Sequence, residues 1–450
     1  MKLKIKAVLA SAALAAALIM MPQVNALADG PPFGETEPNN FNFEANKIVL
    51  YDCVYSELPQ GDKDWYKIYI PKSNTYEFHL GSTNGAAALP ATLTATIYDG
   101  NGNEVFSGCP NGSGIIVYDG TLNGLYYVQI KDDQNTNTNI QYDFEFYPKS
   151  GFGGSIYRFA GLSRYETSYS IFKNNWSYCD YAVITTGENF PDALSAAPLA
   201  KKFNAPIILT NPQALSSDVE NQLKTTGVKN VFIIGGTGAV SKNVEDKLIS
   251  MGIKCTRISG QDRYETSLAI AQYLDPVGAV AVATGADFPD ALSIASIAAC
   301  LEMPILLVDK NSSNEKVCQY IKDTNTEYSF IIGGTGVVST ATQNSILQVC
   351  QNTARIAGAN RYETNINVLE AFGGAIRPHE MFFATGLNFP DALSGSVLAA
   401  AGMHPVVLID KDVDQSTRYY LTKNSNSVIG KCIFGGEGVI PTTTVSQFFN

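Results

Sequence analysis

The chain has 450 residues, of which 45% are hydrophobic and 16% charged, and its formal net charge is −11. This length predicts several domains, and the apolar fraction excludes a largely disordered chain. The acidity argues against nucleic acid as a partner, because phosphate binding normally requires a basic surface. Residues 29–150 carry most of this charge, with 16 acidic and 6 basic side chains, whereas residues 151–450 carry 26 and 22.

Residues 1–28 have the pattern of a secretory signal peptide and are not expected to belong to the fold. A start with three lysines precedes an apolar run at residues 7–21, and Ala26–Ala28 form a small-residue cleavage site. The apolar run is short for a bilayer span, so cleavage is favoured over a permanent anchor. We expect a secreted mature chain that has no membrane attachment after cleavage.

Residues 29–150 show the alternation typical of β-strands. Apolar and polar side chains alternate over residues 66–70, 76–80 and 126–130, and Asp99–Gly102 and Asn123-Gly124 have the composition of hairpin turns. This region is predicted to be an all-β sandwich.

The eight cysteines form no C-x-x-C pair, which argues against a structural zinc site. Secretion permits disulfides, and Cys53 with Cys109 is the first pair to test. Cys432 lies in an apolar run and is better explained as a small core residue.

A glycine-rich linker at residues 151–156 precedes a segment that repeats itself three times. Three motifs recur in the same order: Arg-x-x-Gly-x-x-Arg-Tyr-Glu-Thr, Gly-x-x-Phe-Pro-Asp-Ala-Leu-Ser and Ile-Ile-Gly-Gly-x-Gly. The third copy follows the last motif loosely, because Phe434 stands before its Gly-Gly pair. The first motif starts at Arg158, Arg257 and Arg355, and the second starts at Gly187, Gly285 and Gly386. A period near 98 residues makes each copy a small domain, with boundaries at 157–254, 255–352 and 353–450.

Strands and helices alternate within each copy. In the middle copy, buried strands are predicted at Ala279–Ala283 and Ser329–Ile332, and a helix is predicted to begin at Pro289, where the missing N–H costs nothing. Such alternation predicts a Rossmann-like α/β fold with a parallel sheet. Each motif follows a strand, so we expect all three motifs of a copy to face the ligand-binding edge of one sheet.

Nine side chains at this edge are candidates for ligand binding. The arginines offer planar donor forks to carboxylate or phosphate oxygens, and the tyrosines beside them can stack on sugar faces. The aspartates follow a proline at a helix start, where capping also explains them. The alternative is that the arginines pair internally and hold the repeats together, and the residues alone leave both open. The candidates are Arg164, Tyr165, Arg263, Tyr264, Arg361, Tyr362, Asp192, Asp290 and Asp391.

Catalysis and nucleotide binding find little support. The three histidines do not recur at equivalent repeat positions, and no metalloprotease or serine-hydrolase signature is present. The Gly-Gly-x-Gly segment lacks the Lys-Ser/Thr of a phosphate-binding loop and is better explained as a tight turn. In the third copy Glu437 replaces threonine in this turn, where its charge would repel a phosphate.

The three motifs resemble the type-2 cell-wall-binding repeats of clostridia and related Gram-positive bacteria, over about residues 157–450. The resemblance implies three repeats packed as a pseudo-threefold assembly and non-covalent attachment to an anionic cell-wall polysaccharide. The third copy departs from the motif at Glu437 and at Ile440-Pro441, where the other copies have Val-Ser.

Residues 33–148 more weakly resemble the prepeptidase C-terminal domain, a β-sandwich found on secreted hydrolases. Some relatives bind calcium, and oxygen-bearing side chains of the right type occur here. A solvated acidic edge with turn-forming aspartates is the favoured explanation of these residues. The possible calcium ligands are Glu35, Glu37, Asn39, Asp62 and Asp64.

Together these features predict a secreted, non-catalytic surface protein that displays a β-sandwich and is anchored to the cell wall by its repeats. The alternative is a hydrolase accessory or an adhesin whose activity lies in the β-sandwich.

Overall fold

The computed structural model describes residues 45–48, 53–81, 89–110, 116–134, 139–148, 156–189, 192–376, 378, 380–425, 428 and 430–449. The chain divides into two compact units, one made mainly of residues 31–153 and the other mainly of residues 154–450. Within the described residues, no helix is both long and apolar enough to cross a bilayer.

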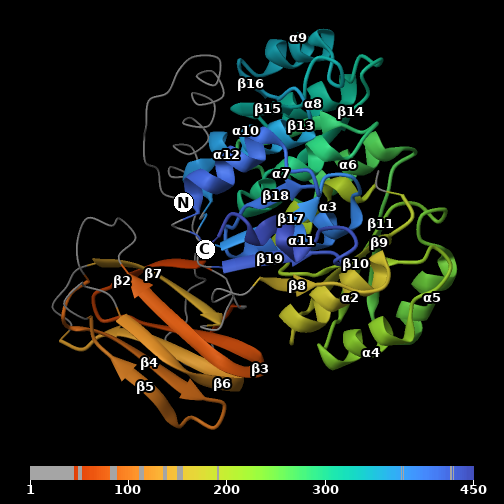
Figure 1. The fold of residues 1–450 in the computed structure, drawn as a ribbon. Coiled ribbons are helices and arrows are strands. Elements are labelled where there is room, and N and C mark those ends of the chain that lie inside the picture. The colour runs from red at the N-terminus through yellow and green to blue at the C-terminus, as the bar shows by residue number, and fades with distance from the viewer. Residues whose placement is uncertain are drawn as a thin grey trace. The chain divides into compact units, whose positions relative to one another are not determined.

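The first unit is a β domain, as predicted (Figure 1). Hydrogen bonds connect its strands in the order β2-β7-β3-β6-β4-β5, and β1 pairs in parallel with β3. The strands are β1 (Asn46–Ile48), β2 (Cys53–Pro59), β3 (Lys63–Gly81), β4 (Leu93–Asp99), β5 (Glu104–Gly108), β6 (Ile116–Asp132) and β7 (Asn139–Pro148).

Two long strands, β3 and β6, allow this sheet to pack against itself. They pair along almost their whole length, with a register shift between Ile70 and Asn74. The second half of β3 pairs with β7, yet Tyr66 from its first half contacts Phe144 of β7 edge-on at 4.7 Å. Because Tyr66 and Phe144 are buried, opposite parts of the sheet enclose a common apolar core.

The second unit contains three four-stranded parallel sheets, ordered β10-β9-β11-β12, β14-β13-β15-β16 and β18-β17-β19-β8. The strands of the first two sheets are β9 (Tyr181–Thr186), β10 (Ile207–Thr210), β11 (Asn230–Ile234), β12 (Lys254–Ile258), β13 (Ala279–Thr284), β14 (Ile305–Val308), β15 (Tyr328–Ile332) and β16 (Asn352–Ile356). The third sheet contains β8 (Tyr157–Phe159), β17 (Glu380–Thr385), β18 (Val406–Ile409) and β19 (Gly430–Phe434). Alternating strands and helices thus form parallel sheets, as predicted.

The sheets are offset from the sequence repeat. The strand that opens the second copy, β12, is the edge strand of the first sheet, and β16 from the third copy completes the second sheet. The third sheet has no following copy, and β8 from the start of the first copy pairs with β19 instead. The expectation that the three motifs of one copy lie at the edge of one sheet is therefore wrong, because the first motif follows a strand of the preceding sheet.

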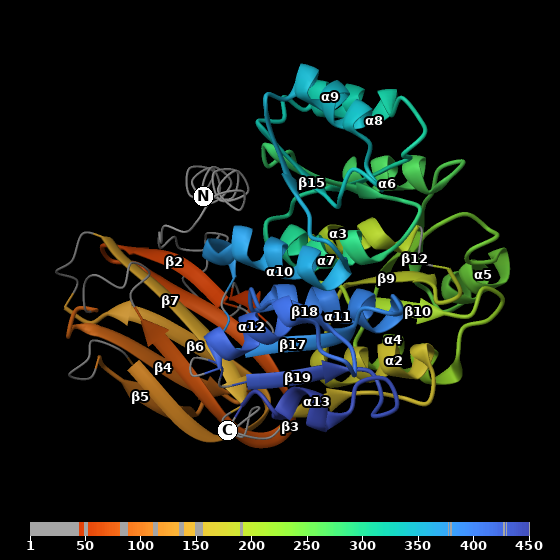
Figure 2. The same cartoon turned by 45° about the horizontal axis from the view of Figure 1, so that its top comes forward.

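Three helices pack together at the centre of this unit (Figure 2). They are α3 (Ala196–Lys202), α7 (Pro289–Cys300) and α11 (Pro390–Ala401), and each contacts the other two. Nearly every residue of α7 and α11 is buried, as expected of helices that are apolar on all sides.

The contacts between copies close in a cycle. The short helix η1 (Ala193–Ser195) of the first copy contacts β14 of the second, α7 contacts β18 of the third, and α11 contacts β10 of the first.

The remaining helices flank the sheets and carry the loops of the site. They are α2 (Arg164–Asn175), α4 (Ser217–Thr225), α5 (Lys242–Ser250), α6 (Arg263–Ala271), α8 (Glu315–Asp323), α9 (Thr340–Val349), α10 (Arg361–Ala371), η2 (Gly373–Ala375), α12 (Gln415–Asn424) and α13 (Thr442–Ser446).

Candidate functional site

The first arginine of each copy fixes a Gly-Gly turn. Arg257 donates from Nη1 to the Gly235 carbonyl at 2.8 Å, and Arg355 donates to the Gly333 carbonyl at 2.6 Å. Arg158 does the same to Gly435 at 2.6 Å, across 277 residues of chain. These arginines lie on the edge strands β12, β16 and β8, so each one locks a strand to the sheet that receives it.

The second arginine of each copy, a predicted binding residue, also has a backbone partner. The Nη1 atoms of Arg164, Arg263 and Arg361 donate to the carbonyls of Gly187, Gly285 and Gly386 at 2.5, 2.6 and 2.6 Å. Each bond joins the first turn of α2, α6 or α10 to the loop that precedes the Phe-Pro-Asp segment.

Two of these arginines, Arg164 and Arg361, also reach a neighbouring copy. The Arg361 guanidinium lies 5.5 Å from the ring centre of Phe288 and 3.7 Å from Asp287, both in the second copy. Arg164 lies 5.6 Å from the ring centre of Phe389 in the third copy. The two phenylalanine rings are 6.3 Å apart, so this cluster lies where copies meet. The Arg361 side chain stays 32% exposed, which leaves part of the guanidinium open to solvent.

The predicted tyrosines pack on glycine rather than standing free. A Cβ added at Gly187, Gly285 or Gly386 would lie 2.5–2.6 Å from the ring of Tyr165, Tyr264 or Tyr362, so only glycine permits this approach. The Tyr165 hydroxyl donates to Glu188. Burial, followed by the effect of Glu188, raises the pKa of Tyr165 to about 12. Burial and the nearby Asp410 likewise raise the pKa of Tyr362 to about 12.

The predicted aspartates lie against the Gly-Gly turns. A Cβ added at Gly333 would lie 2.3 Å from an Asp290 oxygen, and one at Gly435 would lie 2.6 Å from an Asp391 oxygen. Asp192 has the same relation to Gly235, at 2.9 Å. Burial raises the pKa of Asp290 and of Asp391 to about 6, although the arginine of the next copy lowers it in each case.

The structure therefore brings together the second and third motifs of each copy. The second arginine of the first motif joins them through its hydrogen bond to the glycine that opens the second motif. Arg361 lowers the pKa of Asp290, and Arg164 lowers the pKa of Asp391, so each of these two clusters contains side chains from two copies.

The sequence analysis assigned no role to the glutamate of the first motif or to the Ser or Asn that follows the motif. Glu265 accepts a hydrogen bond from the Gln261 N–H, in the manner of a helix capping box. Ser267 accepts from the Leu307 N–H and so satisfies one donor of the edge strand β14. In the third copy Asn365 replaces this serine and bonds both Leu408 and Val406. The consecutive Glu, Thr and Ser after Arg-Tyr were the available signal, because glutamate in a first helical turn and hydroxyl side chains often bond backbone groups.

Glu437, the departure in the third copy, is held inside its own loop. It accepts hydrogen bonds from the Thr442 N–H and hydroxyl, and from Arg158 Nη2 at 3.1 Å. Glu437 therefore stabilises the turn that receives β8.

The possible calcium ligands Glu35, Glu37 and Asn39 lie outside the described residues. Asp64 is fully buried and accepts a hydrogen bond from the Tyr142 hydroxyl. No cluster of three or more metal-ligating side chains occurs in the described part of the chain. Cys109 has a free thiol there, and the Cys53 side chain is not described.

The fold and these loops define a class of protein with three interlocked α/β repeats. The family model described as cell wall binding domain 2 (CWB2) matches residues 158–245, 257–343 and 355–445, more than half of the chain. The chain belongs to this family, and the family associates it with the cell wall.

Known relatives agree with this assignment. A region of 305 residues is 32% identical to the N-acetylmuramoyl-L-alanine amidase LytC of Bacillus subtilis (strain 168), covering 68% of this chain and 60% of the relative. A region of 267 residues is 34% identical to the amidase enhancer of the same organism, covering 59% and 36%. The chain thus spans less than two thirds of either relative.

Two solved structures from Clostridium difficile share the fold. Cwp8 has a TM-score of 0.60 and 26% identity, covering 66% of this chain and 52% of Cwp8. Cwp6 has a TM-score of 0.62 and 21% identity, covering 89% and 68%.

Proposed function

We propose that this is a secreted surface protein, held non-covalently on the Gram-positive cell wall by repeats that bind an anionic secondary wall polymer. The observation that carries the proposal is that all three copies match the cell wall binding family. The β domain is the displayed part, and the repeats are binding modules without catalysis of their own.

The loops between copies are the proposed binding site. Three equivalent sets of loops in a pseudo-threefold arrangement would offer a repeating polymer three similar contacts, whose combined strength exceeds that of each alone. Arg164, Arg263 and Arg361 each use one nitrogen on a glycine carbonyl, and a guanidinium has further donors for a phosphate or carboxylate. The backbone bond holds the fork in place, which lowers the entropy lost on binding.

Charge makes the same site sensitive to ions. Residues 151–450 have four more acidic than basic side chains, so long-range attraction cannot draw in an anionic polymer. Binding then depends on local arginine contacts or on bridging cations, and a chelator or moderate salt should release the protein from walls. Retention that neither treatment changes would contradict this mechanism.

Co-sedimentation with Gram-positive walls tests the proposal. The mature chain and the unit 156–450 should pellet with intact walls, and acid extraction of secondary polymers should abolish this. A chain that stays in solution with intact walls would refute the anchor.

The arginines have two roles to separate. Arg164→Ala, Arg263→Ala and Arg361→Ala together should weaken wall retention on the binding hypothesis, at a temperature where circular dichroism shows the chain folded. If packing is their only role, the melting temperature falls while the folded variant still pellets fully.

A further inference from the structure

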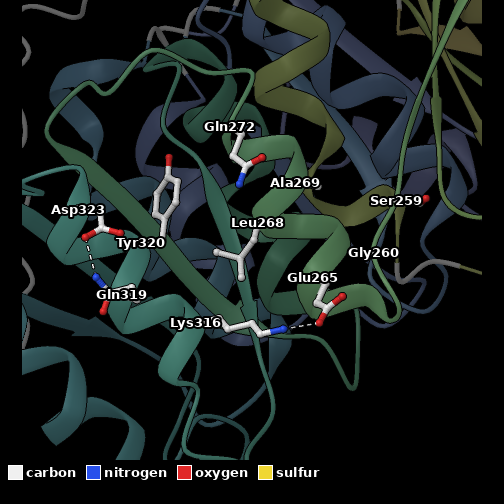
Figure 3. A pocket seen from close by; sticks show the side chains of 10 residues that line it. All are labelled: Ser259, Gly260, Glu265, Leu268, Ala269, Gln272, Lys316, Gln319, Tyr320 and Asp323. Atoms are coloured by element: carbon white, nitrogen blue, oxygen red, sulfur yellow. Dashed lines mark hydrogen bonds and ion pairs between the residues drawn. The ribbon is translucent and has the colours of Figure 1, made fainter.

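A groove of about 420 Å³ lies in the second copy, and its lining includes Ser259, Gly260 and Glu265 of the first motif (Figure 3). It runs between the helices α6 and α8. The side chains that define its chemistry are Glu265, Leu268, Gln272, Lys316, Gln319 and Tyr320.

The middle of the groove is apolar and has an aromatic ring. Tyr320 and Leu268 lie side by side there, with Ala269 beside them on α6 (Figure 3). The Tyr320 hydroxyl donates to the Ala271 carbonyl at 3.2 Å, which ties the ring to α6. A ring fixed in this way presents a surface against which the C–H face of a sugar can pack with little loss of side-chain entropy.

Polar pairs stand on both sides of this apolar strip. Lys316 and Glu265 form an ion pair at 2.5 Å on one side, and Gln319 donates to Asp323 at 2.6 Å on the other (Figure 3). Gln272 adds an exposed amide. Amides, carboxylates and an ammonium around an apolar strip can donate hydrogen bonds to hydroxyl groups and accept hydrogen bonds from them. Small-molecule sites commonly combine an apolar surface with a small number of such polar groups.

The charge of the groove selects against an anion. It has one cation, Lys316, and two carboxylates, Glu265 and Asp323, and the cation is already paired. The net negative charge of the groove would repel a phosphate, whereas it would not repel a neutral sugar.

The first copy has different chemistry at the same positions. With the 98-residue offset that relates Ile233 to Ile331, Asp218 stands in place of Lys316 and Gln222 in place of Tyr320. The combination of an aromatic ring with the lysine–glutamate pair is thus not a feature of the motif shared by the copies.

We propose that this groove binds an uncharged saccharide segment of a wall polymer. This inference rests on the proposed wall binding and deepens it: the inter-copy loops bind the charged groups, and the groove of the second copy binds neutral sugar residues between them.

The test uses neutral oligosaccharides released from Gram-positive wall polymer by hydrofluoric acid, which cleaves phosphodiesters. The oligosaccharides are titrated into the mature chain while the amide chemical shifts are recorded. The shifts of residues in α6 and α8 should change. Binding should change less than twofold between about 0.05 and about 0.5 M salt, because no ion pair with the ligand forms.

The variant Gln272→Ala with Gln319→Ala removes two exposed amides and should weaken oligosaccharide binding at least fivefold. Its matched control is Lys173→Ala with Asn221→Ala, the equivalent exposed positions of the first copy, which should bind like the wild type. Oligosaccharide that leaves α6 and α8 unperturbed, or binds the two variants equally, overturns the groove assignment even where the chain pellets with walls. A wild-type chain that fails to pellet with walls overturns the proposed function instead, whatever the oligosaccharides do.

Discussion

The second and third sheets have the same strand order, but they are completed by different parts of the chain. All four strands of the second sheet come from residues 279–356, whereas the third sheet takes its edge strand from residues 157–159. The second sheet can form from one continuous segment. The third requires both ends of the repeat region to meet, which makes its stability depend on closure of the whole cycle.

The largest expected effect comes from removing this closure. A repeat unit that begins at residue 160 lacks β8, and with it the buried Phe159 and the hydrogen bonds of Arg158 to Gly435 and Ile440. We expect the free energy of unfolding to fall by about 5 kcal/mol or more, because a buried aromatic side chain and a hydrogen-bonded arginine are lost together. Urea denaturation of this unit against a unit that begins at residue 156 measures the difference.

Hydrogen exchange locates the effect of the truncation. Amides of β17, β18 and β19 should lose protection, while those of β13, β14 and β15 keep it. Equal loss in both sheets would mean that closure supports the whole unit rather than the third sheet.

The third sheet also buries an ionisable pair where the second is apolar. Glu380 and His404 are almost fully buried, 3.4 Å apart, and the equivalent residues of the second copy are Ala279 and Met303. His404→Met leaves the Glu380 carboxyl without the imidazole and should cost about 3 kcal/mol. Adding Glu380→Ala reproduces the second copy and should recover at least about 1 kcal/mol of that loss.

A double-mutant cycle measured by chemical denaturation checks this pair. Ala279→Gly with Met303→Leu, at the equivalent positions, is the control that perturbs packing without changing charge. Strictly additive losses at Glu380 and His404 would show that the two side chains are not coupled.

The sequence predicted the repeats and the parallel sheets because each copy has its own strand and helix periodicity. It placed the start of α7 at Pro289 and the strand at Ala279 correctly, since both depend on local residues. It could not predict that β8 pairs with β19, because three residues leave no trace of a partner 275 residues away. The same limit applies to Arg361 and Phe288, whose contact depends on how the copies pack.

The second and third copies should respond alike to acid through their motif aspartates. Burial raises the pKa of Asp290 and Asp391 to about 6 from an unfolded value of 3.8. Between about pH 4 and pH 6 the folded chain therefore binds more protons than the unfolded chain, and the free energy of unfolding falls as pH rises through this window. Asp290→Asn with Asp391→Asn should flatten that slope in denaturation curves at pH 4, 5 and 6. A slope that the double variant leaves unchanged would assign it to other groups.

The smallest expected effect concerns the arginines that bond the Gly-Gly turns of the first and second sheets, Arg257 and Arg355. Arg257 bonds Glu245 at 2.8 and 3.2 Å, whereas Arg355 bonds Gln343, its equivalent, at 3.0 Å. The hydrogen bond from Arg257 lowers the pKa of Glu245, so its stabilisation is present above the unfolded pKa of 4.5 and is lost as pH falls below it. Glu245→Gln should thus cost about 1 kcal/mol at pH 7 and less near pH 3, while Gln343→Ala should show no such pH dependence. A Glu245→Gln loss that is equal at both pH values would mean that the charge of Glu245 adds nothing to its hydrogen bonds with Arg257.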